Sequence, residues 1–431
     1  MAENVLPTTP ENLKPEHLRT LYQVSTWINS TLDFDEALDN AMTAIMQVTK
    51  AQRGFLLRVD ESLIEEEGAE AMDILVAQGF DGEMKESERP SSTIVNQVVK
   101  TREPLLTNNA QFDDRIRPGQ SIIMKGLRAI LASPMLVQDR LIGVVYVDTS
   151  MKAGVFRPDD LSLLQAVSGV AARAIENARL YAVAREKGRL EQELRMAHDI
   201  QENLLPAEMP ATPHYDIASY WQSAREVAGD FYDAFTMQDD TVGAVIADVS
   251  DKGAPAALFM AVARTLLRSH AHAGMTPVEA MSRTNDLIME DAENSGMFVT
   301  MYYSRYKDDG SSQHVNGGHN PPIYYKHSTG SSELLPIGGR ALGWFLNNPL
   351  KEIQIALEPG DAIVYYTDGL TEAENPRGEP YGEDRLISVV NRIGDHTSAE
   401  LMDMILNDVD VFAEGEPPFD DMTMLIVRYN G

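Results

Sequence analysis

The feature that most constrains the fold is one long stretch without proline in the middle of the chain. A helix predicted to begin at Pro158 meets no further proline before Pro206. From residue 180 onward, apolar residues recur at spacings of three and four, as they do along the contact seam of a coiled coil. This pattern predicts a helical linker over residues 181–207 that joins two domains and dimerises. A connector helix packed on its own chain is the alternative. The predicted seam consists of Leu180, Val183, Lys187, Leu190, Leu194, Ala197, Gln201 and Leu204, with polar interruptions at Lys187 and Gln201.

Composition sets the class of protein. With 431 residues, the chain is long enough for two or three domains. Its net charge of −30, from 66 acidic and 36 basic residues, disfavours nucleic acid and anionic membranes as partners. The absence of cysteine excludes disulfides, thiol nucleophiles and cysteine-bound metals. We see no signal peptide and no apolar run near the ~18 residues of a membrane helix, so we expect a cytoplasmic protein.

Two regions of mixed pattern flank the linker. Prolines among polar residues predict a flexible leader over residues 1–15, and a first α/β domain is expected over residues 16–180. Its predicted strands are 54–59, 72–77, 129–137 and 141–147, the last two as a hairpin. A strand-rich second domain with helices is expected over residues 208–431. The predicted fold class is therefore α+β with several domains.

Aspartates stand at the ends of apolar strands in the second domain. Any one of them alone is more typical of a turn or a solvent-facing position. Carboxylates that converge at buried strand ends repel each other unless a cation lies between them, and hard oxygen ligands suit Mg²⁺ or Mn²⁺. The set therefore predicts a metal-dependent enzyme. The candidates are Asp230 after Gly229, Asp248 after the run 242–247, Asp368 after the run 362–367, and Asp420 with Asp421 before the run 422–427.

Seven short motifs follow one another in order through this domain. They are Asp199-Ile-Gln-Glu-Asn-Leu-Leu-Pro206, Glu226-Val-Ala-Gly-Asp-Phe-Tyr-Asp233, Asp248-Val-Ser-Asp-Lys-Gly253, Phe298-Val-Thr300, Asn316-Gly-Gly-His-Asn-Pro-Pro322, Tyr365-Tyr-Thr-Asp-Gly-Leu-Thr-Glu-Ala373 and Asp420-Asp-Met-Thr423. Together they closely resemble the bacterial PPM-type serine/threonine phosphatases, in the branch named for the stage II sporulation protein E phosphatase. The resemblance covers roughly residues 199–428. It implies an α-β-β-α sandwich with two Mn²⁺ or Mg²⁺ ions in a cleft at the strand ends.

The resemblance also assigns roles to individual residues. It implies that Asp230, Asp248, Asp368 and Asp420 bind the metal ions and carry catalysis, and that the backbone carbonyl of Val249 is a further ligand. Asp421 ranks second as a ligand, because related enzymes carry asparagine at its position. The implied reaction is direct hydrolysis by a water molecule that the two metal ions activate. Asp251 and Ala228 replace glycines that are usual in the family, and neither change removes a ligand.

For two other residues, a functional and a structural role are both open. Arg225 could contact the phosphate, although an arginine on a solvated loop is the commoner case. His319 could donate a proton to the leaving oxygen, but we favour a histidine that stabilises the turn of its Gly-Gly-His-Asn-Pro-Pro motif.

The first domain resembles a GAF sensor domain. Such domains bind cyclic nucleotides or other small molecules, or only dimerise, and no motif here identifies a ligand. Without cysteine, a covalently attached bilin is excluded. The strings that carry the resemblance are Arg53-Gly-Phe-Leu-Leu57, Thr101-Arg-Glu-Pro-Leu-Leu106, Gln111-Phe-Asp-Asp-Arg115 and Leu141-Ile-Gly-Val-Val-Tyr-Val-Asp148.

Three functional hypotheses follow. The leading one is a signal-regulated phosphatase that acts on a phosphorylated protein, which the resemblance implies is an anti-sigma-factor antagonist. The second is a non-catalytic, phosphatase-like module that only binds its partner and dimerises. A GAF-linked nucleotidyl cyclase also uses paired aspartates and metals, but it leaves the Thr367-Asp-Gly369 and Asp420-Asp-Met-Thr423 strings unexplained. The four intact aspartates favour the first hypothesis.

Overall fold

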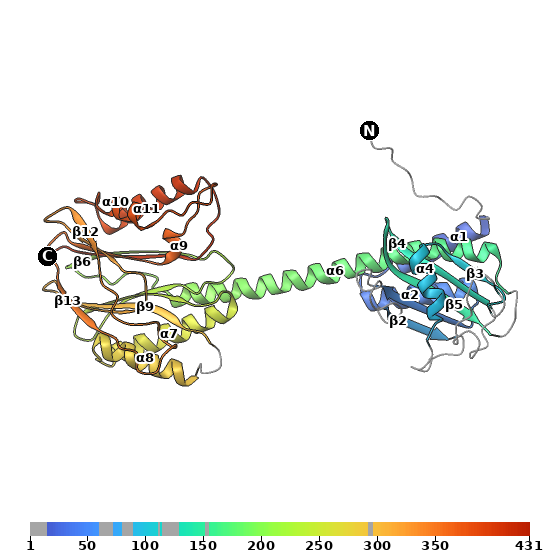
Figure 1. Ribbon diagram of the computed structural model, residues 1–431, viewed down its shortest axis with the longest axis horizontal. Coiled ribbons are helices and arrows are strands. Elements are labelled where there is room, and N and C mark those ends of the chain that lie inside the picture. Colours follow the sequence, from blue (N-terminus) through green and yellow to red (C-terminus); the bar gives the residue numbers. More distant parts are fainter. Residues whose placement is uncertain are drawn as a thin grey trace. The chain divides into compact units, whose positions relative to one another are not determined.

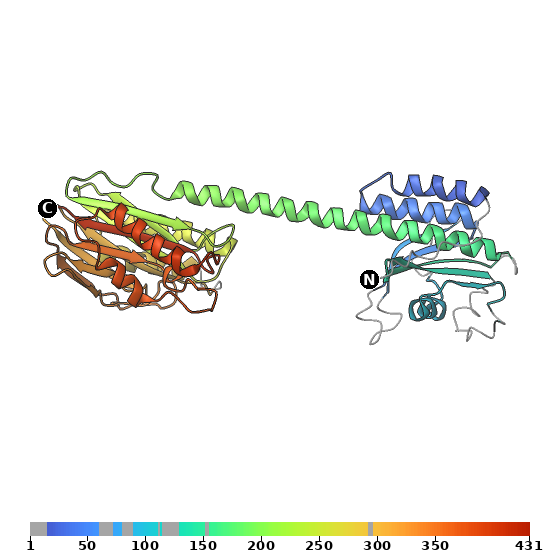
Figure 2. The same cartoon turned by 90° about the horizontal axis from the view of Figure 1, so that it is seen from above.

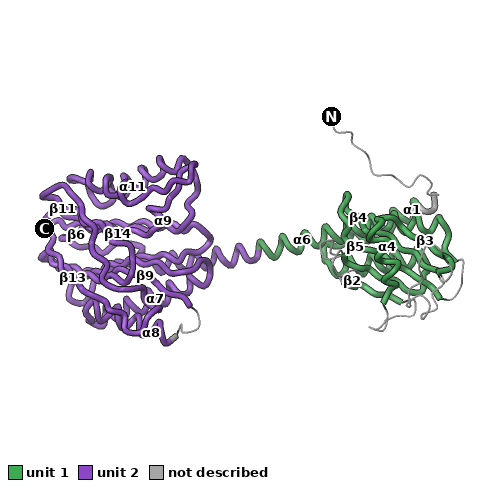
Figure 3. The backbone as a smooth tube through the Cα atoms, in the orientation of Figure 1, with its two compact units in different colours: residues 1–188 green, residues 189–431 purple. Residues whose placement is uncertain are grey.

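The computed structural model describes residues 15–59, 72–79, 89–110, 113, 129–150, 155–291 and 296–431. The chain forms two compact units, residues 1–188 and residues 189–431 (Figure 3). The division falls inside the predicted linker, and the predicted domain limits stay predictions. The leader predicted for residues 1–15 lies outside the described residues except for Pro15, as does the 111–115 string except for Asp113.

The first unit is built on one antiparallel sheet with the strand order β2-β1-β5-β4-β3. Helices α1 (Pro15–Ile28), α2 (Phe34–Thr49) and the start of α6 (Pro158–Leu204) pack on one face, and α4 (Ser92–Thr101) packs on the other (Figures 1 and 2). The expected α/β pattern is thereby confirmed for this unit. Its strands are β1 (Arg53–Val59), β2 (Met72–Gly79), β3 (Leu105–Thr107), β4 (Ala129–Val137) and β5 (Arg140–Thr149).

The predicted hairpin is formed by β4 and β5. Leu136 pairs with Leu141, and Gln138 turns the chain with a left-handed φ of 56°. Successive side chains of β4 point to opposite faces, so Ile130 packs in the α4 cluster while Leu131 packs in the cluster of α2 and α6. Both faces of this strand are buried, which explains its nearly continuous run of apolar residues.

The second unit is a sandwich of two antiparallel sheets with helices on both outer sides (Figure 1). Helices α7 (Ala254–His272) and α8 (Pro277–Asp291) contact the first sheet, which has the order β13-β10-β9-β8-β7. Helices α10 (Glu383–Val390) and α11 (Ser398–Ala413) contact the second sheet, which has the order β12-β11-β14-β15-β6. This arrangement confirms the expected α-β-β-α sandwich.

In the described part of the chain each sheet has five strands, and the apolar runs 242–247, 362–367 and 422–427 of the sequence start at the first residues of β8, β14 and β15. The first sheet contains β7 (Phe231–Thr236), β8 (Val242–Val249), β9 (Val299–Tyr306), β10 (Ser311–Gly317) and β13 (Glu352–Ala356). The second contains β6 (Tyr215–Gln222), β11 (Ile323–Lys326), β12 (Ser331–Leu334), β14 (Ala362–Tyr366) and β15 (Met422–Tyr429). A short helix, α9 (Asp368–Thr371), follows β14.

Helix α6 runs for 47 residues, without a break at Gly188. In the seam, Leu180 and Leu190 are 51% and 47% exposed, and the dimerisation stays a prediction. Gln201, expected as a polar interruption of that seam, is instead buried within the second unit, so the seam prediction is wrong at this residue. None of the helices in the described ranges is both long and apolar enough to cross a membrane.

Candidate active site

Four strand ends of the second unit bring the predicted aspartates to one edge of the sandwich. In the first sheet, Phe231 pairs with Ala247, so the antiparallel register places Asp230 across from Asp248. In the second sheet, β14 and β15 are neighbours, and Asp368 follows one of them while Asp420 precedes the other. The two pairs meet because the Thr423 hydroxyl of β15 donates a hydrogen bond to Asp230 Oδ2 at 2.9 Å. The structure therefore gathers all the carboxylates that the sequence predicted.

The carboxylates act on one another electrostatically. Burial and the charge of Asp248 raise the pKa of Asp230 well above its usual range. Burial and the charge of Asp368 raise the pKa of Asp248 to about 7, and burial with the charge of Asp420 raises that of Asp368. Among the described residues, one cation forms an ion pair with these four carboxylates, namely Lys252 with Asp420, so most of the negative charge is unbalanced. The hard oxygen donors suit a divalent cation such as Mg²⁺ or Mn²⁺.

The donor chemistry fits a metal, but the side chains do not form a closed cage. Among the described residues, no three His, Asp or Glu side chains surround one point at metal-binding distance. The reason is that protein groups already engage several of the oxygens. Asp421 accepts hydrogen bonds from the backbone N–H of Ala224 and of Gly229, both at 2.8 Å, and Asp420 accepts from its own neighbour and from a lysine. The fit to a metal therefore rests on the charge and type of the donors.

Glycines in two motifs allow close backbone approach at this edge. A Cβ atom on Gly229 would lie 3.0 Å from the carbonyl oxygen of Val249, the expected carbonyl ligand. A Cβ atom on Gly369 would lie 2.0 Å from the carbonyl oxygen of Asp421, which no side chain could tolerate. Gly369 of the Thr-Asp-Gly string is therefore required because the backbone of Asp421 lies directly against it. Asp421 itself fixes the turn before Asp230, whatever its part in binding a metal.

Lys252 is a residue of the site to which the sequence pattern gave no role. Its ammonium nitrogen lies 2.7 Å from Asp420 Oδ2. It lines a small cavity together with Arg225, Phe419, Asp420 and Asp421. Its neighbour Asp251 has a φ of 79°, a backbone conformation that glycine adopts most readily, and this explains why related sequences carry glycine there.

A second group of missed residues supports the backbone around Asp230. The Trp221 indole N–H donates to the carbonyl oxygen of Asp230 at 2.9 Å, and His198 of α6 stacks on the Trp221 ring. The Gln201 amide donates to the carbonyl of Ala228 at 2.8 Å and accepts from its N–H at 3.1 Å. The end of α6 is therefore bonded to the segment that carries Asp230. The one sequence signal was a glutamine among apolar seam residues.

His319 occupies a structural position. It is buried, its backbone N–H donates to Asn316 Oδ1 at 2.8 Å, and its Nδ1 lies 2.9 Å from the Thr300 hydroxyl. Burial lowers the pKa of its imidazole to about 4, so the ring is neutral at pH 7. These contacts agree with the turn-stabilising role and leave no exposed proton donor at this position.

Two protein families match the two units. Residues 31–176 match the family described as the GAF domain, and residues 238–430 match the family described as stage II sporulation protein E (SpoIIE). The chain joins a GAF domain to a SpoIIE-type domain. The SpoIIE match includes Asp248, Asp368 and Asp420 and begins after Asp230. We call residues 1–188 the GAF unit and residues 189–431 the SpoIIE unit.

Two curated proteins are similar to this GAF–SpoIIE chain. Protein IcfG of Synechocystis is 31% identical over 265 residues, which cover 55% of this chain and 42% of that protein. Phosphoserine phosphatase RsbU of Bacillus subtilis is 27% identical over 282 residues, which cover 65% of this chain and 81% of RsbU. The chain thus spans less than half the length of IcfG and most of the length of RsbU.

A solved structure supports the fold of the SpoIIE unit. The SiaA-PP2C domain of Pseudomonas aeruginosa superimposes with a TM-score of 0.50 and 20% sequence identity, over 57% of this chain and 99% of that domain. At this identity, the likeness speaks for the fold alone.

Proposed function

We propose that the protein is a cytoplasmic, signal-regulated, metal-dependent phosphatase that hydrolyses phosphoserine or phosphothreonine on a partner protein. The observation that carries the proposal is the cluster of Asp230, Asp248, Asp368 and Asp420, whose carboxylates act on one another and form no ion pair with an arginine of the described residues. The match to the SpoIIE family and the likeness to a protein named phosphoserine phosphatase support it.

The proposed mechanism assigns tasks to the residues at this edge. Asp230, Asp248, Asp368 and Asp420 would hold two Mn²⁺ or Mg²⁺ ions together with the Val249 carbonyl. When bound, the ions neutralise phosphate oxygens and acidify an attacking water. The chain itself supplies orientation, as Arg225 at the cavity binds phosphate and Asp421 fixes the backbone of Ala224 and Gly229. As a further metal ligand, Asp421 stays a secondary proposal.

Hydrolysis of p-nitrophenyl phosphate with Mn²⁺, compared with EDTA, tests the proposal. Asp368→Asn should lower kcat by about 100-fold or more, because a carboxylate that holds the ions loses its charge. Asp395→Asn is the matched control, since that side chain is 98% exposed and far from the cluster in sequence. A folded Asp368→Asn protein with near-normal activity would contradict the metal assignment.

The non-catalytic alternative predicts a different result with a phosphorylated protein. A serine-phosphorylated anti-sigma-factor antagonist is the partner class we propose, on the family resemblance. A phosphatase releases inorganic phosphate from it in a Mn²⁺-dependent reaction, whereas a binding module forms a complex and releases none. Measuring both the complex and the phosphate separates the two functions.

We also propose that helix α6 transmits the state of the GAF unit to this site. The support comes from the last turns of α6, where Gln201 forms hydrogen bonds with the backbone of Ala228 and His198 stacks on Trp221, which donates to the carbonyl of Asp230. A shift of the helix would therefore change how Asp230 is held. Gln201→Leu should alter kcat/KM of the full-length protein, whereas Glu202→Leu, exposed on the same turn, should leave it unchanged.

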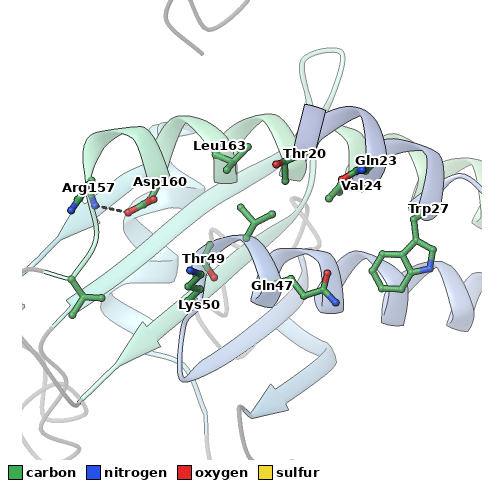
Figure 4. A pocket seen from close by; sticks show the side chains of 12 residues that line it. Thr20, Gln23, Val24, Trp27, Gln47, Thr49, Lys50, Arg157, Asp160 and Leu163 are labelled. Carbon is green, nitrogen blue, oxygen red and sulfur yellow. Dashed lines mark hydrogen bonds between the residues drawn. The ribbon is translucent and has the colours of Figure 1, made fainter. Parts of the chain in front are cut away.

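A groove in the GAF unit offers a place for a small-molecule signal. It has a volume of about 760 Å³, with Arg157 and Asp160 at one end and Trp27 at the other (Figure 4). Lys50 and Arg157 line it, and neither side chain forms an ion pair with another described residue. We propose that an anionic ligand binds here. Cyclic AMP, cyclic GMP and inorganic phosphate should be screened by thermal shift, with Lys50→Gln/Arg157→Gln as the test and Arg173→Gln as the control.

A further inference from the structure

We infer that Lys252 is a built-in cation that competes with one divalent metal ion for Asp420. This inference rests on the proposed function, because it takes Asp420 as a metal ligand. The Lys252 ammonium lies 2.7 Å from Asp420 Oδ2, and the two side chains are only 35% and 30% exposed. The other oxygen, Oδ1, accepts a hydrogen bond from the backbone N–H of Asp421 at 2.9 Å. Both oxygens of this carboxylate are thus engaged by groups of the chain.

The position of Lys252 is fixed by the turn that carries it. Ser250 holds the turn to Phe298 through two hydrogen bonds, one from its backbone N–H and one to its hydroxyl, both 2.9 Å long. Asp251 and Gly253, on either side of the lysine, have positive φ angles of 79° and 80°. The ammonium also lies 4.8 Å from the centre of the Phe419 ring. Lys252 is therefore directed at the site by the backbone, unlike a lysine on a free surface.

The carboxylates of the cluster differ in whether a cation of the chain is already paired with them. In the described part of the chain, neither Asp230 nor Asp248 forms an ion pair with a lysine or arginine. A metal ion that uses these two carboxylates displaces no cation. An ion that uses Asp420 must displace the Lys252 ammonium and then remain close to it, and both requirements weaken binding. The two metal ions should therefore bind with unequal affinity, and Lys252 should set the difference.

Calorimetric titration of the full-length protein with Mn²⁺ tests this inference. The wild type should show a tighter and a weaker class of site. Lys252→Met should lower the Kd of the weaker class about five-fold or more, close to the upper value of a partly exposed ion pair, and leave the tighter class unchanged. Lys252→Arg keeps the charge and should stay within about two-fold of wild type. Lys326→Met removes a lysine paired with Glu333 on another strand and should bind Mn²⁺ as the wild type does.

The inference is overturned if Lys252→Met binds Mn²⁺ no more tightly than wild type, or if Lys252→Arg tightens binding as much as Lys252→Met. Circular dichroism and the thermal midpoint show whether each variant is folded, and Lys252→Gln replaces the methionine variant if that one is not. Hydrolysis of p-nitrophenyl phosphate by wild type is measured separately. Mn²⁺ binding that Lys252→Met tightens, without hydrolysis by wild type, would contradict the proposed phosphatase but support the role of Lys252. Hydrolysis by wild type, with the same Mn²⁺ affinity in Lys252→Met, would support the phosphatase but contradict the role of Lys252.

Discussion

Asp148 in the GAF unit and Asp248 in the SpoIIE unit are both strand aspartates, the first fully and the second partly buried, yet their surroundings are opposite. Asp148 on β5 is fully buried and pairs with its cross-strand neighbour Arg53, which donates two hydrogen bonds of 2.8 and 2.7 Å to the carboxylate. Asp248 on β8 faces Asp230 and Asp368 instead, and its pKa is raised to about 7. A buried carboxylate that the chain neutralises itself is structural, whereas one that faces other carboxylates depends on a cation from outside.

The same distinction operates within a single motif of the SpoIIE unit. In Glu226-Val-Ala-Gly-Asp-Phe-Tyr-Asp233, two aspartates lie three residues apart and look alike in the sequence. Asp233 forms ion pairs with Arg264 at 3.0 Å and Arg268 at 2.7 Å, both from α7. Asp230 has no such partner among the described residues and belongs to the cluster. The arginines of α7 therefore mark Asp233 as structural, and we propose that Asp230, which has no such partner among the described residues, is the functional aspartate.

The sharpest test replaces each of the two contrasting aspartates by asparagine. Asp248→Asn should lower kcat by about 100-fold or more, because a charge that holds the metal ions is lost. In EDTA at pH 8 it should also raise the thermal midpoint of the SpoIIE unit, because a repulsive negative charge is removed from the cluster. Asp148→Asn should lower the thermal midpoint of the GAF unit, because Arg53 loses its charged partner, and should leave the phosphatase activity unchanged. Loss of stability in Asp248→Asn would break the comparison.

The next largest effect concerns Arg53, which pairs with the structural aspartate Asp148 of the GAF unit. Arg53→Met should destabilise the GAF unit by about 3–5 kcal/mol, because it leaves the Asp148 charge buried without its partner. Urea denaturation followed by circular dichroism measures the change. Arg58→Met is the matched control on the same strand, since its partner Asp73 is exposed and the pair contributes little. Equal effects of the two variants would show that Asp148 does not need its arginine.

Helix α6 is itself covered to different extents along its length. Its residues Leu164, Val167 and Ala171 are fully buried in the core of the GAF unit, whereas Leu180 and Leu190, further along the helix, are about half exposed. We expect these exposed residues to contact a second copy of the chain, so light scattering should report twice the mass of 47.7 kDa. Leu190→Asp with Leu194→Asp should lower that mass, while Arg195→Asp with Glu202→Lys, exposed on the same helix, should not. A wild-type monomer at micromolar concentration would refute the dimer.

Much of the fold, and the gathering of the aspartates at one edge of the sandwich, could be predicted because both rest on local pattern. Strands β8, β14 and β15 are buried apolar runs, and the aspartates at their ends needed only proximity to form a site. Lys252 could not be predicted, because its partner Asp420 is 168 residues away and only the folded sandwich brings them together. The prediction for Gln201 was wrong for a similar reason. A heptad pattern shows which residues lie on the same face of a helix, but it does not show that this face contacts the backbone of Ala228.

The smallest effect we predict concerns a third kind of buried titratable group, which is kept neutral rather than paired. His314 of β10 is fully buried and bonds only to the hydroxyls of Ser304 and Ser312, at 2.9 and 2.8 Å. Burial lowers the pKa of its imidazole to about 3.

Below about pH 6.5 the imidazole of His314 takes up a proton in the unfolded chain but not in the folded chain. The SpoIIE unit should therefore lose stability as the pH falls below 6.5. Between pH 7 and pH 5.5 the contribution of His314 to this loss should be about 1 kcal/mol, measured by urea denaturation with tryptophan fluorescence. His314→Gln should reduce the loss by about this amount and leave the part that comes from His319, whose pKa burial also lowers. His396→Gln, on the surface, should leave the loss unchanged. An unchanged pH dependence in His314→Gln would show that this histidine does not take up its proton on unfolding.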